Sequence, residues 1–128
     1  MLIHGKDRQF FLSVQASLEI AELCPDGDLA RIREVLTGNT TKAIRFIARF
    51  VAAMNRGYEN NRKYEEPGYT PDPMTVDEVL TLSYAEMTAL EDEALKAFYG
   101  DVKTEIETKE LKDSKSSPKK EEGTTQAD

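Results

Sequence analysis

The side chains that most often carry out chemistry in proteins are few and widely spaced in this chain. His4 is the only histidine and Cys24 the only cysteine, so the sequence predicts no zinc-type ligand set and no internal disulfide. A nucleophilic Cys24 would need His4 as its base, and a small buried apolar role is the more common one for a cysteine. The segment Asp26-Gly27-Asp28 begins like a calcium loop, but the later acidic ligands and the closing Glu are missing. These residues favour a protein that is not an enzyme and uses no cofactor.

Charge is distributed unevenly along the 128 residues, whose net charge is −7. Residues 1–57 hold 8 Lys/Arg against 6 Asp/Glu, whereas residues 58–128 hold 9 against 18. An acidic chain repels phosphate backbones, so a basic protein or a second copy is a better partner than nucleic acid. No apolar run approaches the roughly 18 residues of a membrane span, and no signal pattern opens the chain. We therefore expect a protein with no membrane partner that stays in the cytosol.

The elements that must position these residues begin with a small hairpin and a helix. Apolar residues predict two short strands, at 2–4 and 9–12, around the turn Gly5-Lys6-Asp7. Ser13 is placed to cap a helix over residues 14–23. Apolar residues lie on two flanks of that helix, so the pattern predicts that most of it is buried.

The clearest helical pattern spans residues 41–58, with Asn39 or Thr40 as its N-cap. One face of this helix is apolar, and four cations gather on the opposite side within about 60° of arc. These cations are Lys42, Arg45, Arg49 and Arg56. Phe46 and Phe50 fall between the two faces, so we expect them to form a second, exposed apolar edge.

Prolines and capping residues organise the second half of the chain. Residues 59–74 contain three prolines and are expected to form a connector. Two capping boxes follow, beginning at Thr75 and Ser83, and each is expected to start a helix. Residues 109–128 hold almost no apolar side chains and are expected to be disordered. The sequence thus predicts a mainly α, bundle-like single domain over 1–108 with a small N-terminal β-hairpin and a disordered tail.

The four cations of the long helix are the strongest candidates for partner binding, together with Phe46 and Phe50. A solvated helix face is the commonest explanation of such a stripe, and docking of acidic residues from a neighbouring subunit is the sharper one. The triplet Glu91-Asp92-Glu93 is usually solvent-facing as well. The apolar stripe of residues 84–98 is expected to be mostly core, with partner contact as the alternative.

The order of the elements resembles that of the tail assembly chaperones of long-tailed, siphovirus-like bacteriophages and prophages. The likeness covers roughly residues 2–99 and is one of pattern and order, because that family is highly divergent and has no catalytic signature. It rests on the hairpin, the proline linker, the segment Met74-Thr75-Val76-Asp77-Glu78-Val79-Leu80 and the positions of Ser13, Ala16, Ile20, Glu22, Ser83 and Glu86.

The resemblance implies a non-enzymatic chaperone that coats the tape measure protein until the tail tube forms around it. It also implies self-association, displacement by the tail tube protein, a location in the host bacterial cytoplasm and absence from the finished virion. Two other interpretations stay open. A head–tail connector or completion protein would remain in virions, and a small bacterial adaptor protein would bind one globular partner.

Overall fold

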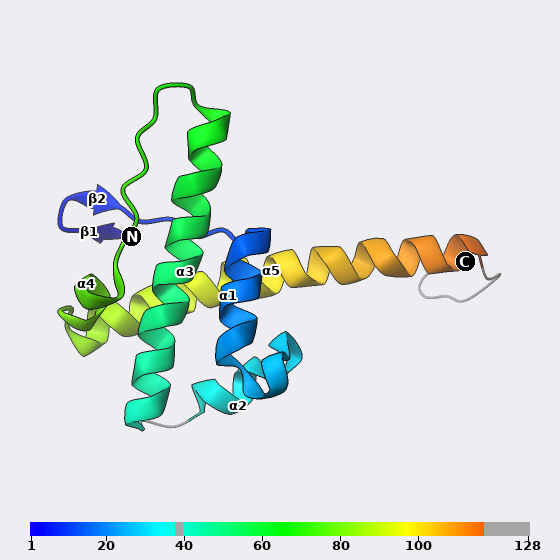
Figure 1. The fold of residues 1–128 in the computed structure, drawn as a ribbon, viewed down its shortest axis with the longest axis horizontal. Coiled ribbons are helices and arrows are strands. Elements are labelled where there is room, and N and C mark those ends of the chain that lie inside the picture. Colours follow the sequence, from blue (N-terminus) through cyan, green and yellow to red (C-terminus); the bar gives the residue numbers. More distant parts are fainter. Residues whose placement is uncertain (38–39, 117–128) are drawn as a thin grey trace. The chain divides into compact units, whose positions relative to one another are not determined.

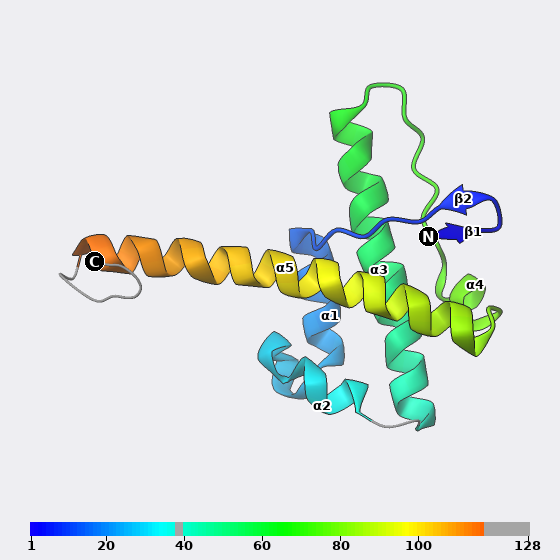
Figure 2. The ribbon, with the colours of Figure 1, turned by 180° about the vertical axis from the view of Figure 1, so that it is seen from behind.

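The computed structural model describes residues 1–37 and 40–116, with side chains described up to residue 100. The described residues are mainly helical, with a two-stranded sheet at the N-terminus, as Figure 1 and Figure 2 show from opposite sides. This confirms the expected fold class. The chain divides into two units, Met1–Phe98 and Tyr99–Asp128.

The N-terminal hairpin is tighter than the sequence predicted. Strands β1 (Leu2–Ile3) and β2 (Lys6–Asp7) pair antiparallel, with Leu2 opposite Asp7 and Ile3 opposite Lys6. The two residues between them, His4 and Gly5, both have positive φ, as two-residue hairpin turns require. The second strand is therefore β2, and the strand expected at residues 9–12 is wrong, because that segment forms no ladder and instead crosses a helix.

The helices in chain order are α1 (Val14–Leu23), η1 (Pro25–Gly27), η2 (Leu29–Arg31), α2 (Ile32–Leu36), α3 (Thr41–Glu65), α4 (Val76–Leu80) and α5 (Tyr84–Ser116). Side-chain caps start several of them, because a hydroxyl satisfies a backbone N–H that has no helical partner. The hydroxyls of Ser13, Thr40 and Thr75 each accept a bond from the N–H three residues on. Ser83 and Glu86 form the full reciprocal box at the start of α5.

Helix α3 is longer than expected and replaces the first part of the expected connector. It runs to Glu65, so only the residues from 66 onward connect it to α4. The extension has a local reason, because the prolines begin only at Pro67 and the preceding residues tolerate helix. An i,i+4 pair between Arg62 and Glu66, with Nε and Oε2 2.8 Å apart, supports the last turn.

Helix α5 continues past the end of the first unit. The backbone of residues 109–116 is helical and belongs to α5, although this segment was expected to be part of a disordered tail. These residues contain neither Gly nor Pro, and they include three Lys, one Glu and one Leu, which have high helix propensity. The rest of the expected tail, residues 117–128, lies outside the described residues.

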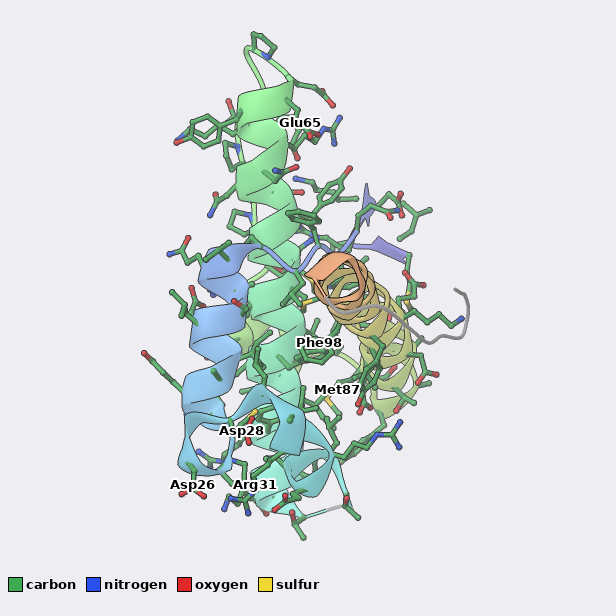
Figure 3. The ribbon with its side chains drawn as sticks, turned by 90° about the vertical axis from the view of Figure 1, so that its right-hand side faces the viewer. Asp26, Asp28, Arg31, Glu65, Met87 and Phe98 are labelled. Carbon is green, nitrogen blue, oxygen red and sulfur yellow. The ribbon has the colours of Figure 1, made fainter. Side chains whose placement is uncertain are left out.

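The core of the first unit forms where α1, α3 and the Tyr84–Phe98 part of α5 pack together. Figure 3 shows Met87 and Phe98 pointing from α5 toward the other helices. The ring of Phe50 lies 6.1 Å from that of Phe46 and 5.7 Å from that of Phe98, between centroids. The α5 stripe predicted to be core is confirmed by the burial of Met87, Leu90, Ala94 and Phe98.

Gly57 allows the chain between the hairpin and α1 to cross α3. The backbone N–H of Phe11 donates to the carbonyl oxygen of Met54 at 3.1 Å, which holds the crossing segment against the helix. A Cβ at position 57 would meet the carbonyl oxygen of Phe11 well inside van der Waals contact, and Ser13 Oγ at 3.1 Å. A glycine in mid-helix is therefore explained by close backbone approach.

We expect Gly57→Ala to destabilise the protein by about 1–3 kcal/mol, because the methyl group would push the crossing segment off α3. The same substitution at Gly100, where nothing lies within 4 Å of a built Cβ, is the matched control. There alanine should stabilise helix α5 by up to about 1 kcal/mol through helix propensity alone. Urea unfolding of both variants measures the difference, and equal effects at the two positions would contradict the crossing geometry.

Candidate interaction surface

The phenylalanines predicted to form an exposed edge are core residues. Phe46 is 4% exposed and Phe50 is fully buried, so the expected apolar edge on α3 is wrong. The physical reason is that α3 is covered on more than one side, by α1 and by α5, which widens its buried arc beyond a single stripe. Neither ring is accessible to a partner in this structure.

The four predicted cations of α3 do not behave alike. Lys42, Arg45 and Arg49 are exposed, and none of the three forms an ion pair with another described residue. Arg56 is half-buried, and its guanidinium pairs with Glu19 of α1, so it fastens α1 to α3. The cationic strip available to a partner therefore consists of Lys42, Arg45 and Arg49.

An apolar strip on α1 remains on the surface, although the sequence predicted that most of this helix is buried. Ala16 and Ile20 face the core, whereas Val14 is 79% exposed and Leu18 63% exposed. Phe11, one turn before Val14, is also exposed, at 37%. We call Phe11, Val14 and Leu18 the α1 apolar strip. It is the main solvent-facing apolar feature of the helix that docks on α3.

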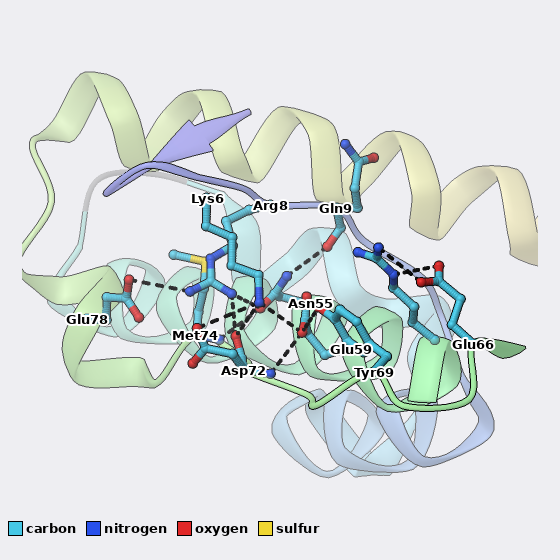
Figure 4. A network of polar contacts seen from close by, with 11 residues as sticks. Lys6, Arg8, Gln9, Asn55, Glu59, Glu66, Tyr69, Asp72, Met74 and Glu78 are labelled. Carbon is cyan, nitrogen blue, oxygen red and sulfur yellow. Dashed lines mark hydrogen bonds and ion pairs between the residues drawn. The ribbon is translucent and has the colours of Figure 1, made fainter. Parts of the chain in front are cut away.

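A buried polar cluster joins the hairpin, α3 and the connector, and Figure 4 shows its contacts. Glu59 is fully buried and its Oε1 accepts three hydrogen bonds: from Lys6 Nζ at 3.2 Å, Tyr69 OH at 2.5 Å and the Asp72 N–H at 2.9 Å. Arg8 is 4% exposed and donates from Nη1 to the carbonyl oxygen of Asp72 at 2.5 Å. The cluster thus ties two distant segments to one helix.

Asn55 is the second α3 member of the cluster. Its Nδ2 donates to the Gln9 carbonyl oxygen at 2.9 Å, and its Oδ1 accepts from the Met74 N–H at 2.8 Å. Glu78 Oε2 lies 3.8 Å from Arg8 Nη2 and 3.2 Å from His4 Nδ1. Instead of closing its own capping box, the Glu78 carboxylate therefore binds the hairpin.

The pKa values of the cluster follow from its contacts. Burial acts to raise the pKa of Glu59, but hydrogen bonds from Tyr69, the Asp72 N–H and Lys6 outweigh it and lower that pKa below its ordinary value. Burial likewise acts to lower the pKa of Lys6, while its contacts with Tyr69 and Glu59 raise it overall. Both groups are therefore held in their charged forms.

Sequence inspection missed this cluster, although one signal was present. Ala48, Ala52, Asn55 and Glu59 lie at successive spacings of four, three and four residues, so they form one row along α3. All four are fully buried. Polar residues in phase with a row of alanines indicate a buried polar contact, but the sequence does not name the partner. Arg8 and Asp72 become neighbours only through the tertiary fold.

The residues first inspected for reactivity have structural roles. Cys24 is buried, as predicted, and burial raises the pKa of its thiol. Asp26 pairs with Arg31, and the Asp28 carboxylate accepts from the Ala30 N–H at 3.0 Å; Figure 3 labels the three charged residues. Within the described ranges no group of three or more His, Cys, Asp or Glu is placed to hold a metal ion. Among these same residues, no helix is long and apolar enough to cross a membrane.

The sequence matches no model of a protein family, and neither a curated protein nor a solved structure is significantly similar to it.

Proposed function

We propose that this chain is a non-enzymatic tail assembly chaperone of a long-tailed bacteriophage or prophage. In this role it binds the tape measure protein in the host bacterial cytoplasm, keeps it soluble, and is displaced when the tail tube protein polymerises. The proposal rests on the resemblance in element order over residues 2–99. The observed order of hairpin, helix, long middle helix, proline-containing connector and final helix is in accord with it.

The α1 apolar strip is the observation that favours client binding most directly. Val14 and Leu18 of α1, together with Phe11 just before the helix, remain exposed, whereas the other face of α1 is buried against the core. Exposed apolar surface of this kind is the usual contact for a partner helix. It replaces Phe46 and Phe50 as the expected client contact, because those two rings already fill the core.

The test is co-expression with the tape measure protein of the same phage genome. We expect the parent chain to keep that protein soluble and Val14→Ser/Leu18→Ser to lower its soluble yield several-fold, because both positions are exposed and their loss leaves the core intact. Tyr64→Ser is the matched control, since Tyr64 is 81% exposed on another element. If the tape measure protein is equally soluble without this chain, and this chain is found in finished virions, the chaperone proposal is wrong. The head–tail connector interpretation would then take its place.

We expect the purified protein to self-associate weakly, through Lys42, Arg45 and Arg49 of one copy and the acidic residues of α5 in another. Each exposed ion pair contributes under about 1 kcal/mol, so only the network is effective, and salt should weaken it. Light scattering of Arg45→Glu/Arg49→Glu should show a smaller species than the parent. Lys63→Glu, compared with Arg45→Glu alone, makes the same charge change outside both the strip and α5 and should leave the assembly intact. A salt-independent oligomer that survives the first variant would exclude this contact.

A further inference from the structure

The connector runs back along α3 and is attached to it by main-chain groups. We call residues 66–74 the strap; Figure 1 shows it descending beside α3. Pro71 and Pro73 have no N–H and bias the residue before each of them toward extended backbone. Between and after the prolines, only Asp72 and Met74 can donate. Both donate to α3, Asp72 to Glu59 and Met74 to Asn55.

The two α3 acceptors match the repeat of an extended chain. Asn55 and Glu59 lie one turn apart, so their Cα atoms are separated by about 6 Å along the helix axis. Alternate residues of an extended chain are separated by about 6.5 Å, so the N–H groups of Asp72 and Met74 fall in register with this row. Arg8 completes the set by donating to the Asp72 carbonyl oxygen.

Two strap side chains take part in this recognition, because Tyr69 OH donates to Glu59 Oε1 at 2.5 Å and Met74 is buried. Asp72 is exposed and engages the cluster through its N–H and carbonyl groups, with its carboxylate 3.6 Å from Lys6 Nζ at the surface. Met74 is the one strap side chain that is buried, at 1% exposure. An extended segment presents the same features if it has N–H groups at alternate positions, one apolar anchor and a tyrosine three residues before the first of these donors.

The closed arrangement also carries a desolvation cost that opening would relieve. Within the described part of the chain, Glu59 Oε2 and Arg8 Nε are buried without a hydrogen-bond partner. Buried charges recover hydration when exposed, and this gain offsets much of the loss of their protein contacts. The desolvation of these two atoms therefore opposes the contacts that hold the strap closed.

We propose that Asn55, Glu59 and Arg8 form a recognition site for an extended protein segment, and that the strap is its resident, exchangeable occupant. When the strap opens, the site takes an extended, proline-flanked segment of a partner protein, through main-chain groups, a tyrosine hydroxyl and one buried apolar side chain. This site is separate from the α1 apolar strip and does not depend on the proposed chaperone role.

A peptide added in trans tests the site directly. The full chain carrying Asp72→Pro lacks the strap donor to Glu59, while Asn55, Glu59 and Arg8 stay intact. Three labelled peptides with the sequence of residues 68–75 are titrated into it: the natural one, one with Ala at the position of Asp72, and one with Pro there. We expect the first two to shift the NMR signals of the Asn55 and Glu59 side chains, and the Pro peptide to bind about 10-fold more weakly.

The wild-type chain should bind the natural peptide more weakly than the Asp72→Pro chain, because its own strap competes. A folded Asp72→Pro chain whose Asn55 and Glu59 signals do not respond at millimolar peptide would overturn the proposal. Equal binding of the Ala and Pro peptides would overturn it too, since main-chain donation would then be irrelevant.

Hydrogen exchange of the wild-type chain gives a second measurement that needs no variant. The Asp72 and Met74 amides should exchange at least about 100-fold faster than core amides of α3 such as Val51, through opening that is insensitive to dilute denaturant. If the strap amides exchange only at the rate of global unfolding, the strap does not open by itself and the proposal fails.

Discussion

Replacing Phe50 by alanine is expected to lower the free energy of unfolding by about 3–5 kcal/mol. The Phe50 side chain is fully buried and contacts the rings of Phe46 and Phe98, so its loss leaves a cavity between α3 and α5. Urea unfolding followed by circular dichroism measures the change. A cost this large is a major fraction of the stability of an ordinary domain.

Tyr84→Ala provides the comparison for Phe50→Ala. Tyr84 is also a large aromatic residue, but it is 71% exposed, so its loss should change stability by less than about 0.5 kcal/mol. A small effect at Phe50 would mean that the Phe50 ring is not the centre of the core. The result also decides how client-binding variants are designed, since replacing both Phe46 and Phe50 by serine should unfold the chain rather than reveal a docking edge.

Glu59→Ala should also cost about 3–5 kcal/mol near neutral pH, because it leaves Lys6 without the buried carboxylate that faces it. The strap would also lose two hydrogen bonds, because Tyr69 OH and the Asp72 N–H both donate to Glu59 Oε1. Glu66→Ala is the control, since Glu66 pairs with Arg62 at the surface and should contribute under about 1 kcal/mol. Similar effects of the two substitutions would contradict a buried role for Glu59.

The same variant predicts how stability depends on pH. The pKa of Glu59 is lowered in the folded chain, so the unfolded chain takes up its proton first as the pH falls. The stability contributed by Glu59 is complete above its unfolded pKa and is lost as the pH falls through the folded one. The difference between parent and Glu59→Ala should therefore shrink from about pH 5 downward. A difference that stays constant to pH 3 would exclude ionised Glu59 as its source.

Lys6 acts at the opposite end of the pH scale. Its pKa is raised in the folded chain, so its contribution is complete below the unfolded pKa and is lost as the pH rises through the folded one. Between these limits both charges are present. Stability measured across the neutral range should therefore be insensitive to this pair.

Much of the fold was accessible from local sequence signals. Ser13, Thr40, Thr75 and Ser83 cap the helices that they were predicted to cap, because a hydroxyl and the N–H three residues on are neighbours in sequence. The bounds of α1 agree with the expected 14–23 for the same reason. A hairpin was expected at the N-terminus, but its second strand was placed at 9–12 instead of Lys6–Asp7, because the tight turn depends on a positive φ at His4. Histidine adopts this conformation more often than most residues, but still uncommonly.

The candidate site was less predictable, because burial depends on which faces are covered. Phe46 and Phe50 lie off the main apolar stripe of α3, and the packing of α1 and α5 against that helix makes them core. Val14 and Leu18 show the converse, since α1 contributes only one of its two apolar flanks to the core. Periodicity identifies an apolar flank, but the number of neighbouring helices decides whether it is buried.

The polar cluster marks the limit of local inference most clearly. The helix caps and the periodic stripes depend on residues a few positions apart, so they can be predicted from the sequence alone. Glu59, Arg8 and Asp72 lie in three different segments, and their side chains meet only when the hairpin and the strap both return to α3. Gly57 depends on the same event, because its missing side chain is needed only where another backbone crosses the helix. Contacts between segments distant in sequence were therefore determined by tertiary packing, since no short-range pattern specifies which segments will meet.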